Sequence, residues 1–195
     1  MKLLSVSIIS AVSLLGAISN ASAQAVAGAV EVPARPNEVE IDKVTNDLVT
    51  TPEYQITGGQ NKRYEIRKWL EIEWEYTTKG KLVDELTFTV NVLVGGKLLP
   101  GTVSYVKIPE GKHFGVMYVA PRTLDTLVGK TVTTSAIQGV WITVANSQGV
   151  MVAQHPKRPT ALPNVARQDG LLLKKTESPF APLYWDRYEA IKASR

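Results

Sequence analysis

The stretch KWLEIEWEY at residues 68–76 alternates bulky apolar side chains with glutamates. The apolar positions are Leu70, Ile72, Trp74 and Tyr76, and the acidic positions between them are Glu71, Glu73 and Glu75. Successive side chains of a β-strand point to opposite faces, whereas a helix would scatter these glutamates around its circumference. The stretch therefore predicts a strand with one acidic and one apolar face, and the apolar face requires a second sheet to cover it.

Similar alternation continues to residue 155. A hairpin is predicted where residues 86–94 run into Gly95-Gly96, because a two-residue turn of this kind needs the positive φ angles that glycine adopts freely. Other strands are predicted at residues 39–42, 97–108 with an interruption at Pro100, 114–119, 131–134, 137–145 and 150–154, with turns at 78–81 and 109–111 and a short helical turn after Pro121. Seven or eight strands with almost no helix predict an all-β, immunoglobulin-like β-sandwich, with a small barrel as the alternative.

The two ends of the chain differ in character from this region. Residues 24–38 are rich in alanine and proline and poor in bulky apolar groups, so we expect a flexible leader before a sandwich domain at residues 39–155. Residues 156–195 begin with a proline-rich stretch that predicts a strap across the surface, with a short edge strand at 171–173. Aromatic residues are dense near the end, and their spacing predicts a short C-terminal helix over residues 182–192 that packs on the domain.

Residues 1–23 have the pattern of a cleaved signal peptide. Lys2 precedes an apolar run over residues 3–18, and Ala21-Ser22-Ala23 has the A-x-A form of a cleavage site. The run is shorter than the ~20 residues that span a bilayer, and serines interrupt it. The sequence thus predicts export to the periplasm, the outer-membrane surface or the extracellular space, with no transmembrane segment in the mature chain.

Composition narrows the classes of partner and chemistry. Without residues 1–23 the chain has 21 basic and 18 acidic residues, and a formal charge of +3 is too small to indicate binding of nucleic acid or of an anionic membrane. The absence of cysteine excludes disulfides, a thiolate nucleophile and a cysteine-ligated metal. The two histidines, His113 and His155, lack metal-ligand spacing, and we expect both in exposed turns.

No ionisable group falls in a catalytic pattern, and the chain lacks the G-x-S-x-G motif of α/β hydrolases. Glu71, Glu73 and Glu75 lie in a row on one strand, whereas the paired carboxyl groups of a glycosidase flank a groove. The row is able to gather calcium weakly, but its expected role is a solvated face that discourages unwanted strand pairing. The sequence therefore predicts no enzymatic activity, no metal and no cofactor, and leaves an unrecognised hydrolase site as the alternative.

The aromatic residues are the candidate interaction residues. Trp69 and Trp141 fall on the outward faces of predicted strands, so each is either covered by the strap or open to a partner. Phe180, Tyr184 and Trp185 lie in the C-terminal segment, which they can latch onto the domain or onto a neighbouring subunit. These five side chains form the predicted interface set.

Three stretches carry a family resemblance: KWLEIEWEY at 68–76, VSYVKIPEGKHFGVMYVAPRTLD at 103–125 and SPFAPLYWDRYEAI at 178–191. In their layout they resemble a group of exported proteins of Akkermansia and related Verrucomicrobia that occur with type IV pilus-like components. The resemblance covers roughly the chain from residue 37 on. It implies an extracytoplasmic immunoglobulin-like fold, surface exposure or pilus association, and self-association, and it transfers no binding residue. A pilin-type cleavage site before a long apolar helix is missing, so an accessory protein is implied rather than a pilin subunit.

Together these observations favour a non-enzymatic exported protein that acts in surface adhesion or pilus-like assembly through protein–protein contacts, with itself or with another protein. The alternative is a carbohydrate-binding module in which Trp69 or Trp141 stacks on a sugar.

Overall fold

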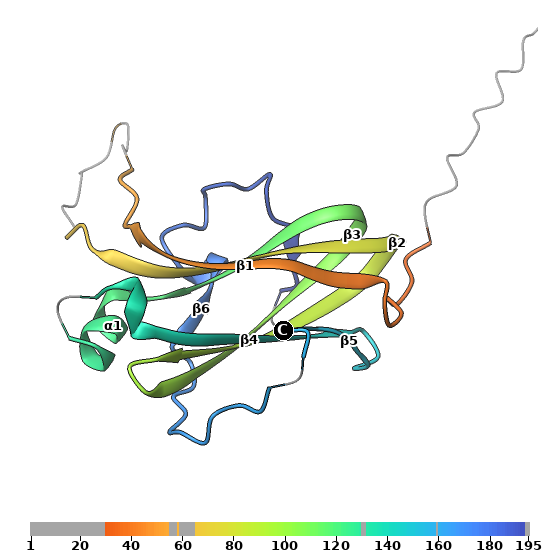
Figure 1. Ribbon diagram of the computed structural model, residues 1–195. Helices are drawn as coiled ribbons and strands as arrows, with labels where there is room; N and C mark the ends of the chain where they lie inside the picture. Colours follow the sequence, from red (N-terminus) through yellow and green to blue (C-terminus); the bar gives the residue numbers. More distant parts are fainter. Residues whose placement is uncertain (1–29, 55–57, 59–64, 130–131, 159, 194–195) are drawn as a thin grey trace, which may run out of the picture.

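The computed structural model describes residues 30–54, 58, 65–129, 132–158 and 160–193, which form seven strands and one short helix (Figure 1). The strands are β1 (Val39–Thr50), β2 (Lys68–Val94), β3 (Lys97–Val119), β4 (Ile137–Asn146), β5 (Met151–His155), β6 (Leu172–Lys174) and β7 (Ala190–Ile191). The helix is α1 (Pro121–Leu127), and two 3₁₀ turns are η1 (Thr134–Ala136) and η2 (Lys175–Glu177). The predicted signal peptide and the first part of the predicted leader lie outside the described residues.

A long hairpin of β2 and β3 runs through the whole fold. The two strands have 27 and 23 residues and pair antiparallel around Gly95-Gly96, whose φ angles of 55° and 71° confirm the predicted turn. The pairing register slips between Thr78 and Leu82, and there the partners of β2 change. The first half of β2, up to Thr78, also pairs with β1, whereas its second half, from Leu86 on, also pairs with β4.

The turns predicted at residues 78–81 and 109–111 are therefore wrong. The chain stays extended through both segments, and each segment lies opposite the other in the hairpin. A local irregularity of this kind bends a strand pair without ending it, because the ladder resumes after the unpaired residues. The sequence signals at Gly80 and Pro109 thus mark a bend in one long hairpin.

The bend brings the two halves of the hairpin face to face as the layers of a β-sandwich, which confirms the predicted fold class. One layer contains β1, the first half of β2, the second half of β3 and β6, and the other contains β5, β4 and the remaining halves. Across the interior, the centroid of the Phe88 ring lies 5.3 Å from that of Trp74 and 4.9 Å from that of Tyr76. The apolar face predicted for residues 68–76 is fully buried, as expected.

Segments from both ends of the chain pack against this sandwich. Leu172 of β6, an edge strand close to the predicted position, is buried beside Gly101, where a Cβ would lie 2.9 Å from the leucine Cβ. In the predicted leader, Val32 forms a bridge with Val83 and Ala34 is buried. Residues 30–38 of that leader thus contact the domain instead of leading freely into it.

Two local predictions are wrong. The expected helix over residues 182–192 is a series of turns that ends in β7, which pairs with Tyr105 and Val106 of β3. Pairing with the open edge of β3 competes with helix formation here, and the positive φ of Tyr184 (53°) lies outside the right-handed helical region. The strand expected at residues 131–134 lies partly outside the described residues, and its end instead begins η1.

Replacing Gly115 by alanine should destabilise the fold, because the Trp74 ring lies directly against the glycine and a Cβ there would overlap it. Overpacking of this kind costs about 1–3 kcal/mol. Urea unfolding of Gly115→Ala should show a loss in this range. In the double variant with Trp74→Phe the smaller ring should recover part of the Gly115→Ala cost, and strict additivity of the two losses would contradict the proposed overlap.

Candidate functional site

The outer face of the first layer is covered by the C-terminal segment, residues 178–191. Phe180 stacks on Tyr118 with ring centroids 4.5 Å apart and packs edge-on against Trp69 at 5.8 Å. This second apolar cluster also includes Val116, with Val49, Leu183 and Tyr188 at its margin. Trp69 and Phe180 of the predicted interface set thus contact each other within the chain, and Phe180, at 4% exposure, latches the segment onto its own domain.

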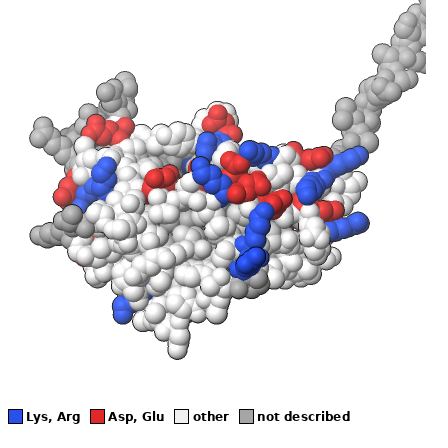
Figure 2. All heavy atoms as spheres, in the orientation of Figure 1, with Lys and Arg blue, Asp and Glu red and all other residues white. Residues whose placement is uncertain are grey.

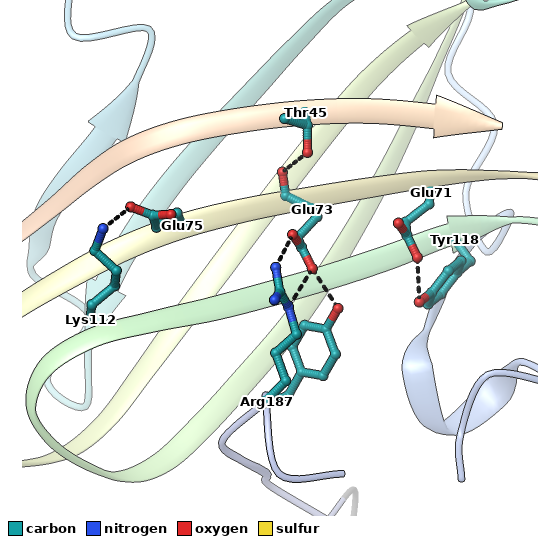
Figure 3. A network of polar contacts seen from close by, with 8 residues as sticks. Thr45, Glu71, Glu73, Glu75, Lys112, Tyr118 and Arg187 are labelled. Atoms are coloured by element: carbon teal, nitrogen blue, oxygen red, sulfur yellow. Dashed lines mark hydrogen bonds and ion pairs between the residues drawn. The ribbon is translucent and has the colours of Figure 1, made fainter. Parts of the chain in front are cut away.

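The glutamate row beneath this segment is paired rather than solvated (Figure 3). Glu73 accepts hydrogen bonds from Arg187 Nη2 at 2.7 Å and Nε at 3.1 Å, and from the Tyr188 hydroxyl at 2.6 Å. Glu71 accepts a bond of 2.8 Å from the Tyr118 hydroxyl. The expectation of a solvated face is wrong because the partners of Glu73 arrive from residues more than a hundred positions away, which the local pattern does not reveal.

Burial changes the titration of this network. Partial burial raises the pKa of Glu71, and the negative charge of Glu73 adds to the rise, while the Tyr118 hydrogen bond opposes it. Burial likewise raises the pKa of Tyr118 and of Tyr188 far above the ordinary tyrosine range. Both hydroxyls therefore remain protonated at neutral pH and serve as donors to the carboxylates.

A second anchor joins the C-terminal segment to the bend of the hairpin. His113 Nδ1 lies 2.8 Å from Glu189 Oε1, and His113 Nε2 lies 2.9 Å from the carbonyl oxygen of Pro109. At 6% exposure His113 is buried within β3, so the expectation of an exposed turn is wrong for this histidine. The other, His155, is half-buried at the end of β5.

The turn between Phe180 and Arg187 presents two aromatic side chains to solvent. Tyr184 is 59% exposed and Trp185 is 80% exposed, the largest exposure of any large hydrophobic residue that the structure describes. The Arg187 amide donates to the Tyr184 carbonyl at 3.1 Å and closes the turn. We call Tyr184 and Trp185 the aromatic tip. Its flanks are fixed by Phe180 on one side and Arg187 on the other.

Two hollows lie beside the covered face. One of about 490 Å³ is lined mainly by carbon atoms, at the end of the sheet where Trp69, Ala120, Pro121 and Pro179 meet. The other, of about 600 Å³, is bordered by β1 and the C-terminal segment, and Glu71 and Glu73 both line it.

In Figure 2 the charged side chains of the visible face gather mainly over β1 and the neighbouring strands, and the surface below carries few.

Trp141, the remaining member of the predicted set, lies far from these residues in the fold. It is half-buried on β4 in the other layer, where it pairs across the ladder with Asn91 of β2. The five predicted residues therefore form a contacting pair of half-buried Trp69 and buried Phe180, an exposed tip and a separate tryptophan. Sequence reasoning missed Arg187, Tyr188 and Glu189, whose only signal was their position within the dense aromatic stretch.

The described ranges hold neither a metal-binding cluster nor a membrane-spanning helix. There, no group of three or more histidine, aspartate or glutamate side chains is placed to hold a metal ion. Nor does any helix in those ranges have the length and apolar character needed to cross a membrane.

Comparisons with known proteins agree with the fold. A protein-family model matches residues 31–195. Among solved structures, the crystal structure of a protein from Akkermansia muciniphila superposes with a TM-score of 0.69 at 20% sequence identity, covering 81% of this chain and 94% of that one. No curated protein matches the sequence. At this identity the structural likeness shows a shared fold. Akkermansia is also the source of the proteins that the sequence resembles.

Replacing Glu73 by glutamine should loosen the C-terminal segment, because the charged partner of Arg187 is lost. Hydrogen bonds to charged groups contribute about 1.5–3 kcal/mol, and partial exposure places this one near the lower end. Amide hydrogen exchange at Ala190 and Ile191 should accelerate by roughly tenfold. Glu75→Gln is the matched control, since Glu75 pairs with Lys112 of β3 and not with the segment. Equal acceleration in both variants would contradict this role.

Replacing Glu71 by glutamine should change how stability depends on pH. Because its pKa is raised in the folded state, the native protein holds this proton more tightly than the unfolded chain does. The stability that the group contributes is present at low pH and is lost as pH rises through the folded pKa. Urea unfolding should thus show Glu71→Gln gaining stability relative to the parent as pH rises above about 4, the ordinary pKa of a glutamate. An unchanged difference over that rise in pH would refute the assignment.

Proposed function

We propose that this chain, which belongs to the family whose model matches residues 31–195, is a non-enzymatic exported protein that acts in surface adhesion or pilus-like assembly. It does so through contacts with other protein subunits. The observation that carries this proposal is the aromatic tip, because a tryptophan exposed on an anchored turn is a typical contact residue of protein interfaces. The Akkermansia proteins that the sequence resembles occur with pilus-like components, which supports the same reading.

The ionisable groups near the tip have structural partners, which supports a binding role over a catalytic one. Glu73 accepts hydrogen bonds from Arg187 and Tyr188, and Glu71 accepts one from Tyr118. A general acid or base needs a side chain placed to exchange a proton with a substrate. The predicted signal peptide supports export, and the mature protein then meets its partners in the periplasm, at the outer-membrane surface or outside the cell.

A second copy of this chain is the partner to which we commit. The chain carries both a protruding indole, Trp185, and an apolar hollow of about 490 Å³ lined by Trp69, Ala120 and Pro121. A knob and a hollow on different surfaces of the same molecule produce a heterologous contact, which closes into rings or extends into filaments. Such head-to-tail contacts suit an assembly component.

Light scattering of the chain from residue 24 onward should therefore show self-association that Trp185→Ala reduces. Truncation of the whole strap is unsuitable, because β6 and β7 pair with β3 and Leu172 lies in the core. Met151→Ala is the matched control, since this side chain is 57% exposed on β5. Monomeric parent protein, or equal association of the parent and Trp185→Ala, would contradict the proposal.

Ala120→Asp should block the hollow while preserving the fold. Ala120 is the N-cap of α1 and makes no side-chain cap, so aspartate there suits the helix while placing a charge against the apolar wall. Neither Trp185→Ala nor Ala120→Asp should associate alone. Mixed together they should form a heterodimer, because one copy retains the knob and the other the hollow. Failure of the mixture to associate would exclude this pairing of surfaces.

A further inference from the structure

The outer face of the second layer contains a pocket of about 340 Å³ that lies apart from the aromatic tip. Its floor is formed by β2, β4 and β5, and strap residues from Thr160 to Arg167 form one wall. The strap is held there by backbone hydrogen bonds of Leu98, whose amide donates to Ala166 and whose carbonyl accepts from Gln168. Pocket volumes of about 300–1,000 Å³ are typical of small-ligand sites. This pocket has the size for a single small ring.

Trp141 provides a flat apolar surface in this pocket. Its ring lies over Gly139, where a Cβ would approach the indole Cη2 to 2.6 Å. Any side chain at that position would force the ring to move, so the glycine lets the indole lie along β4. The ring is only half-buried, and it lines the pocket. Its place is thus fixed by the sheet before any ligand binds.

Asn91 places a polar group beside the indole. The residue is only 7% exposed, and its side-chain amide makes no hydrogen bond with any residue in the described ranges. In the described ranges, the side-chain polar atoms that are fully enclosed and lack a partner are Trp74 Nε1 and Tyr76 Oη. The Asn91 amide is not one of them, so it retains access to the pocket that it lines. A side-chain amide offers both hydrogen-bond donors and an acceptor. A ligand in the pocket would satisfy both its donor and its acceptor.

The remaining walls combine neutral polar side chains with the apolar Pro156 and Leu162, and only one of their residues carries a charge. Thr89 and Thr143 face each other across the ladder, and Gln154 adds an amide. Burial lowers the pKa of His155, so its ring is neutral at pH 7. Arg167 is the single charged residue of the lining, and its Nη2 forms a long, exposed ion pair of 4.0 Å with Asp169 Oδ1. Such an exposed pair is weak, so the guanidinium can exchange Asp169 for the carboxylate of a ligand.

We propose that this pocket binds a pyranose sugar, with one face of the ring on Trp141 and the hydroxyl groups bonded to Asn91. A sugar presents an apolar face of C–H groups and a rim of hydroxyls, which matches an aromatic surface edged by neutral donors and acceptors. Arg167 adds a preference for sugars that carry a carboxylate. The site does not depend on the aromatic tip or on self-association.

The experiment uses the chain from residue 24 onward, labelled and applied to immobilised glycans with hexose, N-acetylhexosamine, uronic acid and sialic acid ends. We expect binding to at least one of these classes, stronger where a carboxylate is present. The strongest ligand should then be titrated by calorimetry against three variants. Trp141→Ala should weaken binding by about tenfold, or about 1.4 kcal/mol, because the surface on which the sugar stacks is lost.

The other two variants separate the parts of the proposal. Arg167→Gln should remove the preference for acidic over neutral sugars and leave the neutral affinity unchanged. Trp185→Ala, at the tip, should bind as the parent does, so failure of the assembly proposal would leave this result intact. Because Trp141→Ala removes a large half-buried ring, nitrogen-15 spectra of the parent provide a second test. The ligand should shift the Trp141 indole and Asn91 amide signals. Absence of glycan binding, or binding that leaves these signals unmoved, would overturn the proposal.

Discussion

The continuous ladder between β2 and β3 determines where the other elements lie. Its register slip near Thr78 bends both strands, so a single hairpin supplies the centre of both layers. The aromatic contacts of Phe88 with Trp74 and Tyr76 then fill the space between the two halves of one strand. Every other strand attaches to an edge of this hairpin or to β4 beside it. Loss of the bend would separate the layers and expose the core.

The C-terminal segment turns a strand face into an internal interface. Without it, the outer face of the first layer would expose the glutamate row and the rings of Trp69 and Tyr118. Phe180 covers the rings, Arg187 neutralises Glu73 of the row, and Tyr188 donates a hydrogen bond to the same carboxylate. The end of this segment, β7, and the preceding strand β6 cover the open edge of β3. Protection of that edge limits unwanted strand pairing, a role that the sequence assigned to the glutamates alone.

The two outer faces suit different kinds of contact. The first layer ends in a protruding indole at Trp185, fixed by its neighbours in a turn, and this geometry favours a protein surface with a matching hollow. The second layer holds Trp141 flat in a recess beside the unpaired amide of Asn91, and this geometry favours a small polar ring. The proposed contact between subunits and the proposed sugar site therefore lie at separate places.

The sequence by itself determined the faces of the strands, because alternation has a period of two residues and is read locally. It therefore gave the buried side of residues 68–76, the Gly95-Gly96 hairpin, the helical turn after Pro121 and the sandwich class. Only the tertiary structure decided that residues 78–81 bend instead of turning back, that residues 182–192 form no helix, and that Glu73 meets Arg187. Each of these depends on partners distant along the chain, and such partners leave no local pattern.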